Sequence, residues 1–364
     1  MNFKPTKSIF FFLPNLAGGG AEKVIVNIVN KLYERGNKVE ILLSHKTGTY
    51  LKDVNEKIPV VDFASKKVMF SFFKLLKYLR KNKPEILFVT HPHTSFIAAI
   101  CVVINFYSTK LVIREAIKPD FYYNKKNIFS FFQKMVKAFT LFNAHKIVLP
   151  SIEMKNDLAH NNLYSQKKLI HIYNPIDFEL IKKKSEIKEK DFFKEDFIIS
   201  VARLEKQKDF LTLIKAFKII SGKININLLI LGEGDDRYRI EQMINNFKLN
   251  DRVFLPGFVD NPYYYIRKSR LLVHSSFAEG LPNSLLQAAS LKKIIISTDC
   301  DYGPKEIING TNYGYLVPVG DQMLLAKNIE RSLSNQNTLR LNQEFLKKFN
   351  IEKIINSYEK LFDE

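Results

Sequence analysis

One carboxylate in this chain sits where a ligand is normally bound. Glu279 belongs to the stretch FAEGLPN, which follows the apolar run Leu271–Val273 and precedes an apolar helical segment starting at Ser284. Open α/β sheets bind anions and sugars where a strand feeds a Gly- and Pro-containing turn into a helix. At that place the unpaired N–H groups and the positive end of the helix dipole face the ligand. The pattern therefore predicts that Glu279 contacts a bound ligand rather than solvent alone.

Two cations follow another predicted strand, Phe197–Val201. Arg203 leaves the end of this strand, and Lys208 lies just before the helical segment Phe210–Ser221. A guanidinium offers a planar pair of donors and an ammonium offers a point charge, so two fixed cations on one turn can clamp a diphosphate. The alternative is a pair of surface cations in a basic chain. Their position at a strand end favours the diphosphate site.

A glycine run, Gly18, Gly19 and Gly20, separates the first predicted strand from the first helix. It does not match G-x-G-x-x-G, and Ser44 and His45 follow the next strand in place of an acidic residue, so a dinucleotide site is not indicated. The glycines still allow the backbone to approach a ligand closely. The alternative is a tight turn without a ligand.

Two short motifs could suggest a metal. His91 and His93 follow a strand, but no carboxylates lie nearby, so a metal is not predicted there; a contact to a sugar or acceptor and an ordinary loop are equally supported. The stretch Asp299-Cys300-Asp301 is formally D-x-D. It lies in the strand-to-loop sequence TDCDYGPKEII before a helix, where a metal is not favoured. We predict no metal site.

The elements that must position these residues alternate along the chain. In the first half, apolar runs of strand length are separated by segments with helical spacing of apolar residues, and Ile170 to Asp177 ends this half. The predicted strands are Ser8–Pro14, Val39–Leu43, Val60–Phe63, Ile86–Thr90, Lys110–Arg114 and Lys146–Pro150. The predicted helices are Ala21–Glu34, Phe70–Lys81, Thr94–Asn105 and Phe129–Leu141. Alternation of this kind predicts a parallel sheet covered on both faces.

The pattern restarts after a charged stretch, Lys182–Lys194, which we interpret as a solvated connector. Helices are predicted at 210–221 and 237–247. Six further strands are predicted: Phe197–Val201, Asn227–Leu231, Val253–Leu255, Leu271–Val273, Ile294–Ser297 and Gly314–Val317. We expect a domain of residues 1–175 and a domain of residues 176–345. The amphipathic stretch Ile351–Leu361 ends the chain.

Nearly the whole chain, and most strongly the stretch from Ser200 to Val319, resembles the family-4 retaining glycosyltransferases, which have the GT-B fold. The resemblance rests on VARLEKQKD around Arg203 and Lys208, on LGEGD around Gly232 and Gly234, and on FAEGLPN around Glu279. It implies two doubly wound Rossmann-like domains facing a central cleft, with the C-terminal segment 346–364 packed back on the first domain.

The resemblance also implies roles for single residues. Arg203 and Lys208 would contact the donor diphosphate, Gly232 and Gly234 would shape the nucleotide pocket, and Gly18–Gly20 would match the family's inter-domain glycine loop. Glu279 would contact the sugar hydroxyls, and the amides after it would contact sugar and phosphate. The loop residues implied in donor binding are Gly280, Leu281, Pro282, Asn283 and Ser284.

The chain departs from the family pattern at two places. Gln287 stands where the family usually has a second glutamate, which would accept hydrogen bonds from both ribose hydroxyls. A glutamine can accept one and donate another without charge assistance. Many relatives also have a histidine in the region that here contains Arg114-Glu115-Ala116.

The charge of the chain is unevenly placed. Residues 1–175 carry 27 Lys+Arg against 11 Asp+Glu, whereas residues 176–364 carry 29 against 26. Lys66–Lys83 and Lys125–Lys146 mix lysines with Phe and Leu at helical spacing, which is typical of helices on a membrane surface and also of helices packed on their own sheet. The two cysteines, Cys101 and Cys300, imply no disulfide framework and a reducing compartment.

These observations lead to one hypothesis. The chain is predicted to be a hexosyl- or N-acetylhexosaminyltransferase that moves a sugar, with retention and without a metal, from a nucleotide-diphosphate-sugar. We expect a UDP-sugar as co-substrate and a membrane-associated acceptor, either polyprenyl-diphosphate-linked or lipopolysaccharide, as in bacterial surface-glycan synthesis. We expect a cytoplasmic protein attached peripherally to the inner face of the anionic membrane. The N-terminal apolar run is short, no span is predicted, and no nucleic-acid motif appears.

Three other functions stay open on the sequence. The charge alone permits a nucleic-acid-binding protein, although the aromatic residues have core-like periodicity and no RNA or DNA motif appears. A GT-B nucleotide-sugar epimerase would release free sugar or an epimer without any acceptor. A non-catalytic nucleotide-sugar binder, which Gln287 keeps possible, would bind the donor and never transfer.

Overall fold

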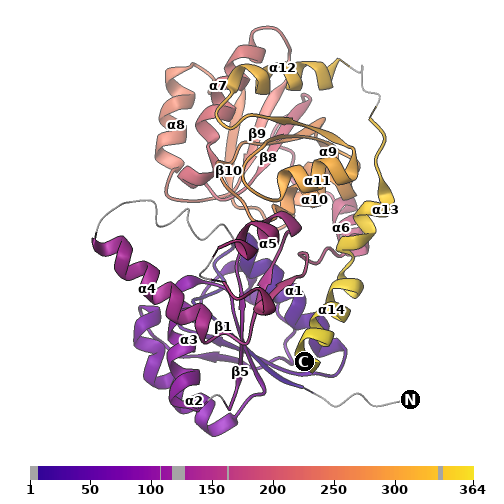
Figure 1. Cartoon of the computed structure of the whole chain (residues 1–364). Helices are drawn as coiled ribbons and strands as arrows, with labels where there is room; N and C mark the ends of the chain where they lie inside the picture. The colour runs from indigo at the N-terminus through magenta and orange to yellow at the C-terminus, as the bar shows by residue number, and fades with distance from the viewer. Residues whose placement is uncertain (1–6, 107, 117–127, 162–163, 335–338) are drawn as a thin grey trace. The chain divides into compact units, whose positions relative to one another are not determined.

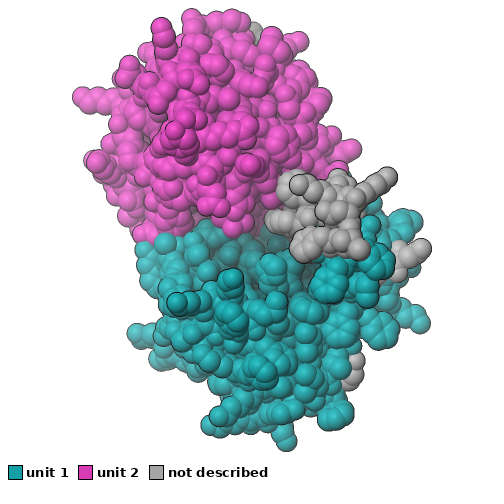
Figure 2. Space-filling view, turned by 90° about the vertical axis from the view of Figure 1, so that its left-hand side faces the viewer, with its two compact units in different colours: residues 1–175, 351–364 teal, residues 176–350 magenta. Residues whose placement is uncertain are grey.

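The computed structural model describes residues 7–106, 108–116, 128–161, 164–334 and 339–364, with the backbone alone described at 128–130. The chain forms two compact units. Unit 1 contains residues 1–175 and 351–364, and unit 2 contains residues 176–350; Figure 2 colours them separately. Residues 346–350, which the sequence analysis placed in the C-terminal segment, belong to unit 2, because Phe349 is buried there and its carbonyl accepts from Ile176 N at 2.7 Å.

Unit 1 contains a parallel sheet in the order β3-β2-β1-β4-β5-β6-β7 among its described residues. The strands are β1 Ser8–Leu13, β2 Lys38–Leu43, β3 Val60–Asp62, β4 Ile86–Val89, β5 Lys110–Arg114, β6 Lys146–Leu149 and β7 Leu169–His171. The inner strands are continuous apolar runs, such as Ile9-Phe10-Phe11-Phe12-Leu13 in β1, and these five side chains are almost fully buried. Such runs form because helices cover both faces of a parallel sheet.

Helices cover the two faces of this sheet as its connections dictate. α2, α3 and α4 lie on one face, and α1 and α14 lie on the other (Figure 1). The helices are α1 Gly20–Glu34, α2 Phe72–Asn82, α3 Pro92–Ile104, α4 Ile128–Phe142, α5 Ile152–Ala159 and α14 Ile351–Asp363; the 3-10 turns are η1 Thr49–Asp53, η2 Val68–Ser71 and η4 Gln166–Lys168. Lys125 and Lys126, which begin the second predicted basic segment, lie outside the described residues.

The last helix, α14, completes unit 1. Its Tyr358 is fully buried and packs edge-on against Phe88 of β4, with ring centroids 5.8 Å apart. Arg35, at the end of α1, donates to Glu359 of α14 at 2.8 Å and also pairs with Glu352. α14 is therefore held by both an apolar face and ion pairs to α1.

Unit 2 repeats the architecture with a parallel sheet in the order β10-β9-β8-β11-β12-β13. The strands are β8 Phe197–Val201, β9 Asn227–Leu231, β10 Val253–Gly257, β11 Leu271–His274, β12 Ile294–Thr298 and β13 Gly314–Val317. The helices are α6 Phe178–Glu186, α7 Phe210–Ser221, α8 Arg237–Asn246, α9 Pro262–Lys268, α10 Asn283–Ser290, α11 Pro304–Thr311, α12 Gln322–Leu333 and α13 Gln343–Leu346, with 3-10 turns η5 Lys206–Lys208 and η6 Lys347–Phe349. α7, α8 and α12 cover one face, and α9, α10 and α11 cover the other (Figure 1).

The charged stretch Lys182–Lys194 is not the solvated connector that the sequence predicted. Its first part lies in α6, which packs on α9. Phe192 stacks on Tyr265 with ring centroids 5.4 Å apart, and Phe193 contacts Phe254. Most lysines of the stretch face solvent, whereas Phe192 and Phe193 pack on α9 and β10.

Two parallel sheets with alternating helices confirm the predicted α/β class. Within the described residues, none of the helices combines the length and apolar composition required to cross a lipid bilayer.

Candidate active site

The candidate site forms where the connections of the unit 2 sheet diverge. β8 and β11 are neighbours, with Leu272 opposite Ile199, but the chain leaves β8 toward β9 and leaves β11 toward β12 on the other side. Ligands of open α/β sheets bind at such a switch point, outside the carboxyl ends of the strands. The loops that follow β8 and β11 carry Arg203, Lys208 and Glu279.

Three hydrogen bonds tie these two loops together. Gln207 Nε2 donates to Ala278 O at 2.6 Å, Phe277 N donates to Gln207 O at 2.8 Å, and Ser275 Oγ donates to Lys208 O at 2.9 Å. The backbone of Lys208 is therefore fixed relative to the loop that carries Glu279.

The loop after β12 supports the Glu279 loop from its other side. Thr298 Oγ1 donates to Ser276 O at 2.7 Å, and Glu279 N donates to Asp301 O at 3.4 Å. Gly303 has φ +76°, and a Cβ there would lie 2.8 Å from Gly280 O, so only glycine permits this approach. The loop that carries Glu279 is consequently held by contacts with the loop after β8 on one side and with the end of β12 and the loop after it on the other.

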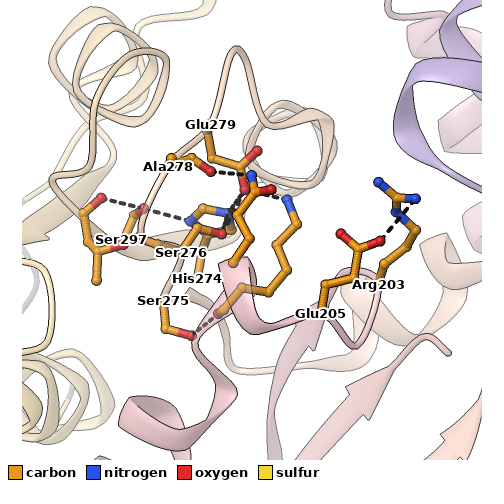
Figure 3. Close-up of polar contacts among 11 residues, drawn as sticks. Arg203, Glu205, His274, Ser275, Ser276, Ala278, Glu279 and Ser297 are labelled. Atoms are coloured by element: carbon orange, nitrogen blue, oxygen red, sulfur yellow. Dashed lines mark hydrogen bonds and ion pairs between the residues drawn. The ribbon is translucent and has the colours of Figure 1, made fainter. Parts of the chain in front are cut away.

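Glu279 Oε1 is the centre of the polar cluster drawn in Figure 3. Lys208 Nζ lies 2.5 Å from it, His274 Nε2 2.9 Å and Ser276 Oγ 2.7 Å. His274 is in turn placed by Ser297 Oγ, 3.0 Å from its Nδ1. One oxygen of the carboxylate is thus occupied by a cation, an imidazole and a hydroxyl.

The charge state of Glu279 follows from these contacts. Burial of the side chain opposes ionisation, but the charges and hydrogen bonds of Lys208 and His274 outweigh it, so the pKa of Glu279 lies well below its usual range. An ionised carboxylate accepts several hydrogen bonds. Oε2 can therefore accept from hydroxyl groups of a sugar while Oε1 stays with its protein partners.

α10 begins immediately beyond this carboxylate. Pro282 is the N-cap and Asn283 starts the helix, one residue before the predicted start at Ser284. Asn283 and Gln287 are four residues apart and lie on one helix face, and both are partly exposed. Gly280, Leu281 and Pro282 are buried, and Ser284 is partly exposed. The start of α10 lies next to Glu279 in the chain.

Arg203 is not brought together with Lys208. Its side chain is 46% exposed and pairs with Glu205 at 3.0 Å, to one side of the Glu279 cluster in Figure 3. In this structure Arg203 pairs with Glu205 and Lys208 pairs with Glu279, and the diphosphate clamp stays a prediction.

The Gly232–Gly234 turn packs directly on the loop after β8. A Cβ on Gly232 would lie 1.9 Å from Ala202 O, and Leu204 N donates to Glu233 O at 2.8 Å. The side chain of Glu233 is exposed and pairs with Arg237 at 2.6 Å. The two glycines thus allow the backbones after β8 and β9 to meet at the edge of the site.

The predicted residues of unit 1 gather at its own sheet edge. Gly18, with φ +106°, and Gly19 end the loop after β1, and Gly20 begins α1. His91 is the N-cap of α3, and His93 is exposed in the first turn of that helix. His91 Nε2 lies 3.4 Å from Oε1 of Glu22, a residue for which the sequence suggested no role.

The D-x-D stretch lies in the loop after β12, where the carbonyl of Asp301 accepts from Glu279 N. Burial raises the pKa of the Cys300 thiol, and Asp299 and Asp301 are exposed. Glu306 lies in the first turn of α11. Over the ranges that the structure describes, no three His, Cys, Asp or Glu side chains are grouped so that they could hold a metal ion.

Sequence reasoning missed His274, Ser276 and Gln207. His274 ends an otherwise apolar strand, and Ser276 lies two residues further, so both were visible as polar residues at the correct edge of the sheet. Gln207 carries no such signal. Its role depends on a hydrogen bond to Ala278, 71 positions away.

Solved structures share the fold of the whole chain. The structure of Anabaena Alr3699/HepE in complex with UDP and glucose superposes with a TM-score of 0.79 at 16% identity, covering 98% of this chain and 99% of that one. Sucrose-phosphate synthase from Thermosynechococcus elongatus superposes with a TM-score of 0.78 at 16% identity, covering 98% of each. The two parallel α/β units thus define a protein of the GT-B fold.

Family models then specify the class. The model "Glycosyl transferases group 1" matches residues 177–348, and the model "Glycosyltransferase Family 4" matches residues 18–180. Together they account for nearly all of the chain, which belongs to the family-4 glycosyltransferases. It is therefore a glycosyltransferase, as the sequence predicted.

Two relatives from Campylobacter jejuni align along most of their length. One, named N-acetylgalactosamine-N,N'-diacetylbacillosaminyl-diphospho-undecaprenol 4-alpha-N-acetylgalactosaminyltransferase, is 28% identical over 334 residues, which is 89% of each chain. The other, named as an alpha-1,4-N-acetyl-D-galactosaminyltransferase acting on GalNAc-alpha-(1->4)-GalNAc-alpha-(1->3)-diNAcBac-PP-undecaprenol, is 26% identical over 341 residues, covering 90% of this chain and 89% of the relative.

Proposed function

We propose that this chain transfers an N-acetylhexosamine or hexose from a nucleotide-diphosphate-sugar to a polyprenyl-diphosphate-linked glycan, with retention of configuration at the anomeric carbon. One observation carries the proposal. The buried, ionised Glu279 lies at the switch point of unit 2, immediately before the start of α10, and its Oε1 is held by three side chains. A carboxylate can orient sugar hydroxyls, and a helix start favours phosphate.

The relatives support the choice of donor and acceptor. Both Campylobacter proteins are named for N-acetylgalactosamine transfer to undecaprenol-diphosphate-linked sugars. We therefore propose UDP-N-acetylgalactosamine and UDP-N-acetylglucosamine as the first donors to test. A lipopolysaccharide acceptor is the second candidate on the same chemistry.

The mechanism we propose needs no metal ion. As the bond between sugar and diphosphate breaks, negative charge develops on the leaving diphosphate. The N–H groups at the start of α10 and the cation of Lys208 would stabilise it, which is catalysis by preorganised charge. Arg203 would add to this on leaving Glu205, since its exposed side chain costs little to move. Glu279 would hold the sugar while the acceptor hydroxyl attacks from the face that the diphosphate leaves and passes its proton to the departing diphosphate oxygen.

We also propose that unit 1 docks on an anionic membrane surface. α2 and α4 flank α3 on one face of the sheet, and both expose large apolar side chains beside lysines. The membrane-facing residues would be Met69, Phe70 and Phe73 on η2 and α2, and Phe131, Phe132 and Met135 on α4, each more than half exposed. Apolar side chains enter the headgroup layer while lysines meet the lipid phosphates.

The test uses the purified full chain, a panel of UDP- and other nucleotide sugars, and a polyprenyl-diphosphate-linked oligosaccharide, all with EDTA present. We expect sugar transfer that survives EDTA, an α-linked product by NMR, and a loss of at least about 100-fold in kcat/KM for Glu279→Gln. Glu233→Gln, an exposed carboxylate on the neighbouring loop, is the matched control and should keep full activity.

Three results would contradict parts of the proposal. Donor binding without transfer to any lipid-linked glycan would indicate a non-catalytic binder. Release of an epimer without acceptor would indicate an epimerase. Transfer abolished by EDTA and restored by a divalent cation would overturn the metal-independent mechanism.

A further inference from the structure

A second sheet edge in the molecule has the same topology as the candidate active site. In unit 1 the neighbours β1 and β4 send the chain in opposite directions, β1 toward β2 and β4 toward β5. The loops that follow them diverge, as do the loops after β8 and β11 in unit 2. A switch point of this kind leaves a crevice outside the carboxyl ends of the strands.

An acid–base pair spans this edge of unit 1. Glu22 lies in the first turn of α1, and His91 is the N-cap of α3. His91 Nε2 lies 3.4 Å from Glu22 Oε1, with side chains 29% and 9% exposed. Two helices that start from adjacent strands thus place an imidazole against a carboxylate, 69 positions apart in the chain.

The glycine loop is shaped around Glu22. A Cβ on Gly19 would lie 2.1 Å from Glu22 Oε2, so a side chain at this position would displace the carboxylate. Glu22 therefore turns back over the loop toward the sheet edge instead of extending into solvent, as a glutamate in a first helical turn otherwise can. The absence of a side chain at Gly19 thus leaves room for the carboxylate of Glu22.

A buried cation, Arg114, interacts electrostatically with Glu22. Arg114, at the end of β5, is 2% exposed and donates to Asn174 Oδ1 at 2.5 Å. Its charge attracts Glu22, and its Nε forms no hydrogen bond within the described part of the chain. The edge thus combines a carboxylate, an imidazole and a guanidinium, with Thr90 3.5 Å from the guanidinium.

These groups suit a sugar better than a phosphate. A carboxylate repels phosphate, whereas its oxygens accept from vicinal hydroxyls, and an imidazole can donate to or accept from a hydroxyl. The partial exposure of His91 leaves the pair open to a ligand. Unit 2 uses the same combination at its own switch point, where Lys208 and His274 hold Glu279.

We propose that Glu22 and His91 form a sugar-hydroxyl-binding subsite in unit 1, which positions the acceptor's terminal sugar for transfer. This inference rests on the proposed function. In it, the pair binds and orients the acceptor, and neither residue contacts the donor.

The decisive experiment separates acceptor from donor in steady-state kinetics. Glu22→Gln and His91→Gln should each raise the KM for the lipid-linked acceptor at least about 10-fold, with kcat changed less than about threefold, and the Kd of UDP-sugar unchanged by calorimetry. The matched controls are His93→Gln, at an exposed histidine two residues further along the chain, and Glu34→Gln at the other end of α1. Neither control should change the acceptor KM, kcat or the Kd of UDP-sugar.

A binding measurement keeps the test independent of turnover and of stability. Saturation-transfer NMR with methyl N-acetyl-α-galactosaminide, in the presence of excess UDP, should show a signal with the wild-type chain that Glu22→Gln abolishes and His93→Gln retains. An unchanged acceptor KM and an unchanged NMR signal in Glu22→Gln would overturn the subsite. A weakened donor Kd with an unchanged acceptor KM would do so too, by assigning the pair to the donor.

Failure of the proposed function would look different. The wild-type chain would then transfer no sugar at all, while the NMR signal and its loss in Glu22→Gln would still report on the subsite. If Glu22→Gln unfolds below the assay temperature, His91→Gln tests the subsite instead. The measurements are again the acceptor KM and the saturation-transfer NMR signal.

Discussion

At the scale of single residues, the main feature is that the protein contacts of the Glu279 carboxylate converge on one of its two oxygens. Lys208, His274 and Ser276 all contact Oε1. A group whose charge and orientation are fixed before the ligand arrives needs no reorganisation during the reaction, which is the condition for electrostatic catalysis. The effects of Glu279 and of the residues that hold its carboxylate should therefore be measured together.

Replacing Lys208 by Met should destabilise the protein by about 3 kcal/mol, because it leaves the buried Glu279 carboxylate without its cation. Adding Glu279→Gln to the same chain should recover most of this loss, since a neutral amide needs no counter-charge. Urea denaturation of the four chains in a double-mutant cycle measures the coupling. Lys206→Met, an exposed change in the same 3-10 turn, should have almost no effect, and additive effects of the two changes would contradict a coupled pair.

A second residue predicts how stability depends on pH. Burial lowers the pKa of His171 to about 4, and its ring packs edge-on against Tyr173 with centroids 4.2 Å apart. The unfolded histidine titrates near 6.5, so between about pH 6.5 and 4 the unfolded state binds a proton that the folded state does not. Stability should therefore fall as the pH falls through this window, by on the order of 2 kcal/mol from this group.

His171→Gln removes this titration. Its unfolding free energy, measured by urea denaturation at a series of pH values, should fall less steeply than that of the wild-type chain between pH 6.5 and 4. Parallel curves for the two proteins would show that His171 is protonated with the same pKa in both states.

The sequence predicted a role for Glu279 but not its contacts with His274 and Ser276. Glu279 stood out because a strand, a glycine and a helix start surround it within a dozen positions. Gln207 and Glu22 act through contacts that exist only once distant strands are neighbours, so no local pattern marks them. His274 was visible at the end of its strand, and its polarity in an apolar run was the signal to use.

At the scale of elements, α14 is the least local part of the fold. It is amphipathic, and its buried face includes Ile354, Ile355, Tyr358 and Leu361. Its exposed side pairs with Arg35 and Lys31 of α1. Burial of the apolar face provides most of the stabilisation, because partly exposed ion pairs contribute only about 0–1 kcal/mol each.

Tyr358→Ala should therefore lower the stability of unit 1 by about 3–5 kcal/mol, since it opens a cavity against Phe88 in a fully buried region. Tyr238→Ala in α8, where the ring is 71% exposed, is the matched control and should change stability by less than about 0.5 kcal/mol. Urea titrations followed by circular dichroism measure both. A small effect of Tyr358→Ala would mean that α14 is dispensable for unit 1.

Strands and long helices were predictable for a physical reason. A strand buried on both faces must be apolar along its whole length, so β1 and β9 could be located almost to the residue. The same reasoning failed for Lys182–Lys194, where charge is the dominant signal. In that stretch the packing contacts are made by isolated apolar residues such as Phe192 and Phe193. Two adjacent apolar residues are too few to form a periodic pattern.

At the scale of the whole molecule, charge and exposed apolar surface coincide in unit 1. Residues 1–175 carry most of the net charge of +19. On α2 and α4, Phe73 is 77% exposed and Phe131 is 66% exposed. A clustered positive charge gains about 1 kcal/mol per Lys or Arg at an anionic membrane, and salt screens this gain.

The full chain should sediment with vesicles containing phosphatidylglycerol at low salt, and much less at 0.5 M salt or with neutral phosphatidylcholine vesicles. Phe73→Asp with Phe131→Asp should weaken the binding at least about 10-fold. Tyr238→Asp, at an exposed ring of unit 2, should leave it unchanged. Equal binding to neutral and anionic vesicles would contradict a surface built from charge and apolar side chains together.

The placement of α14 has a consequence for how the chain is made. Because residues 351–364 complete unit 1 while residues 176–350 form unit 2, the first unit waits during synthesis until all of the second has been translated. At ribosomal rates of about 5–20 residues per second, that interval is roughly 10–35 s. Throughout it the apolar surface around Phe88 lacks its cover, so a nascent chain of this protein presents a site for chaperones that the finished protein does not have.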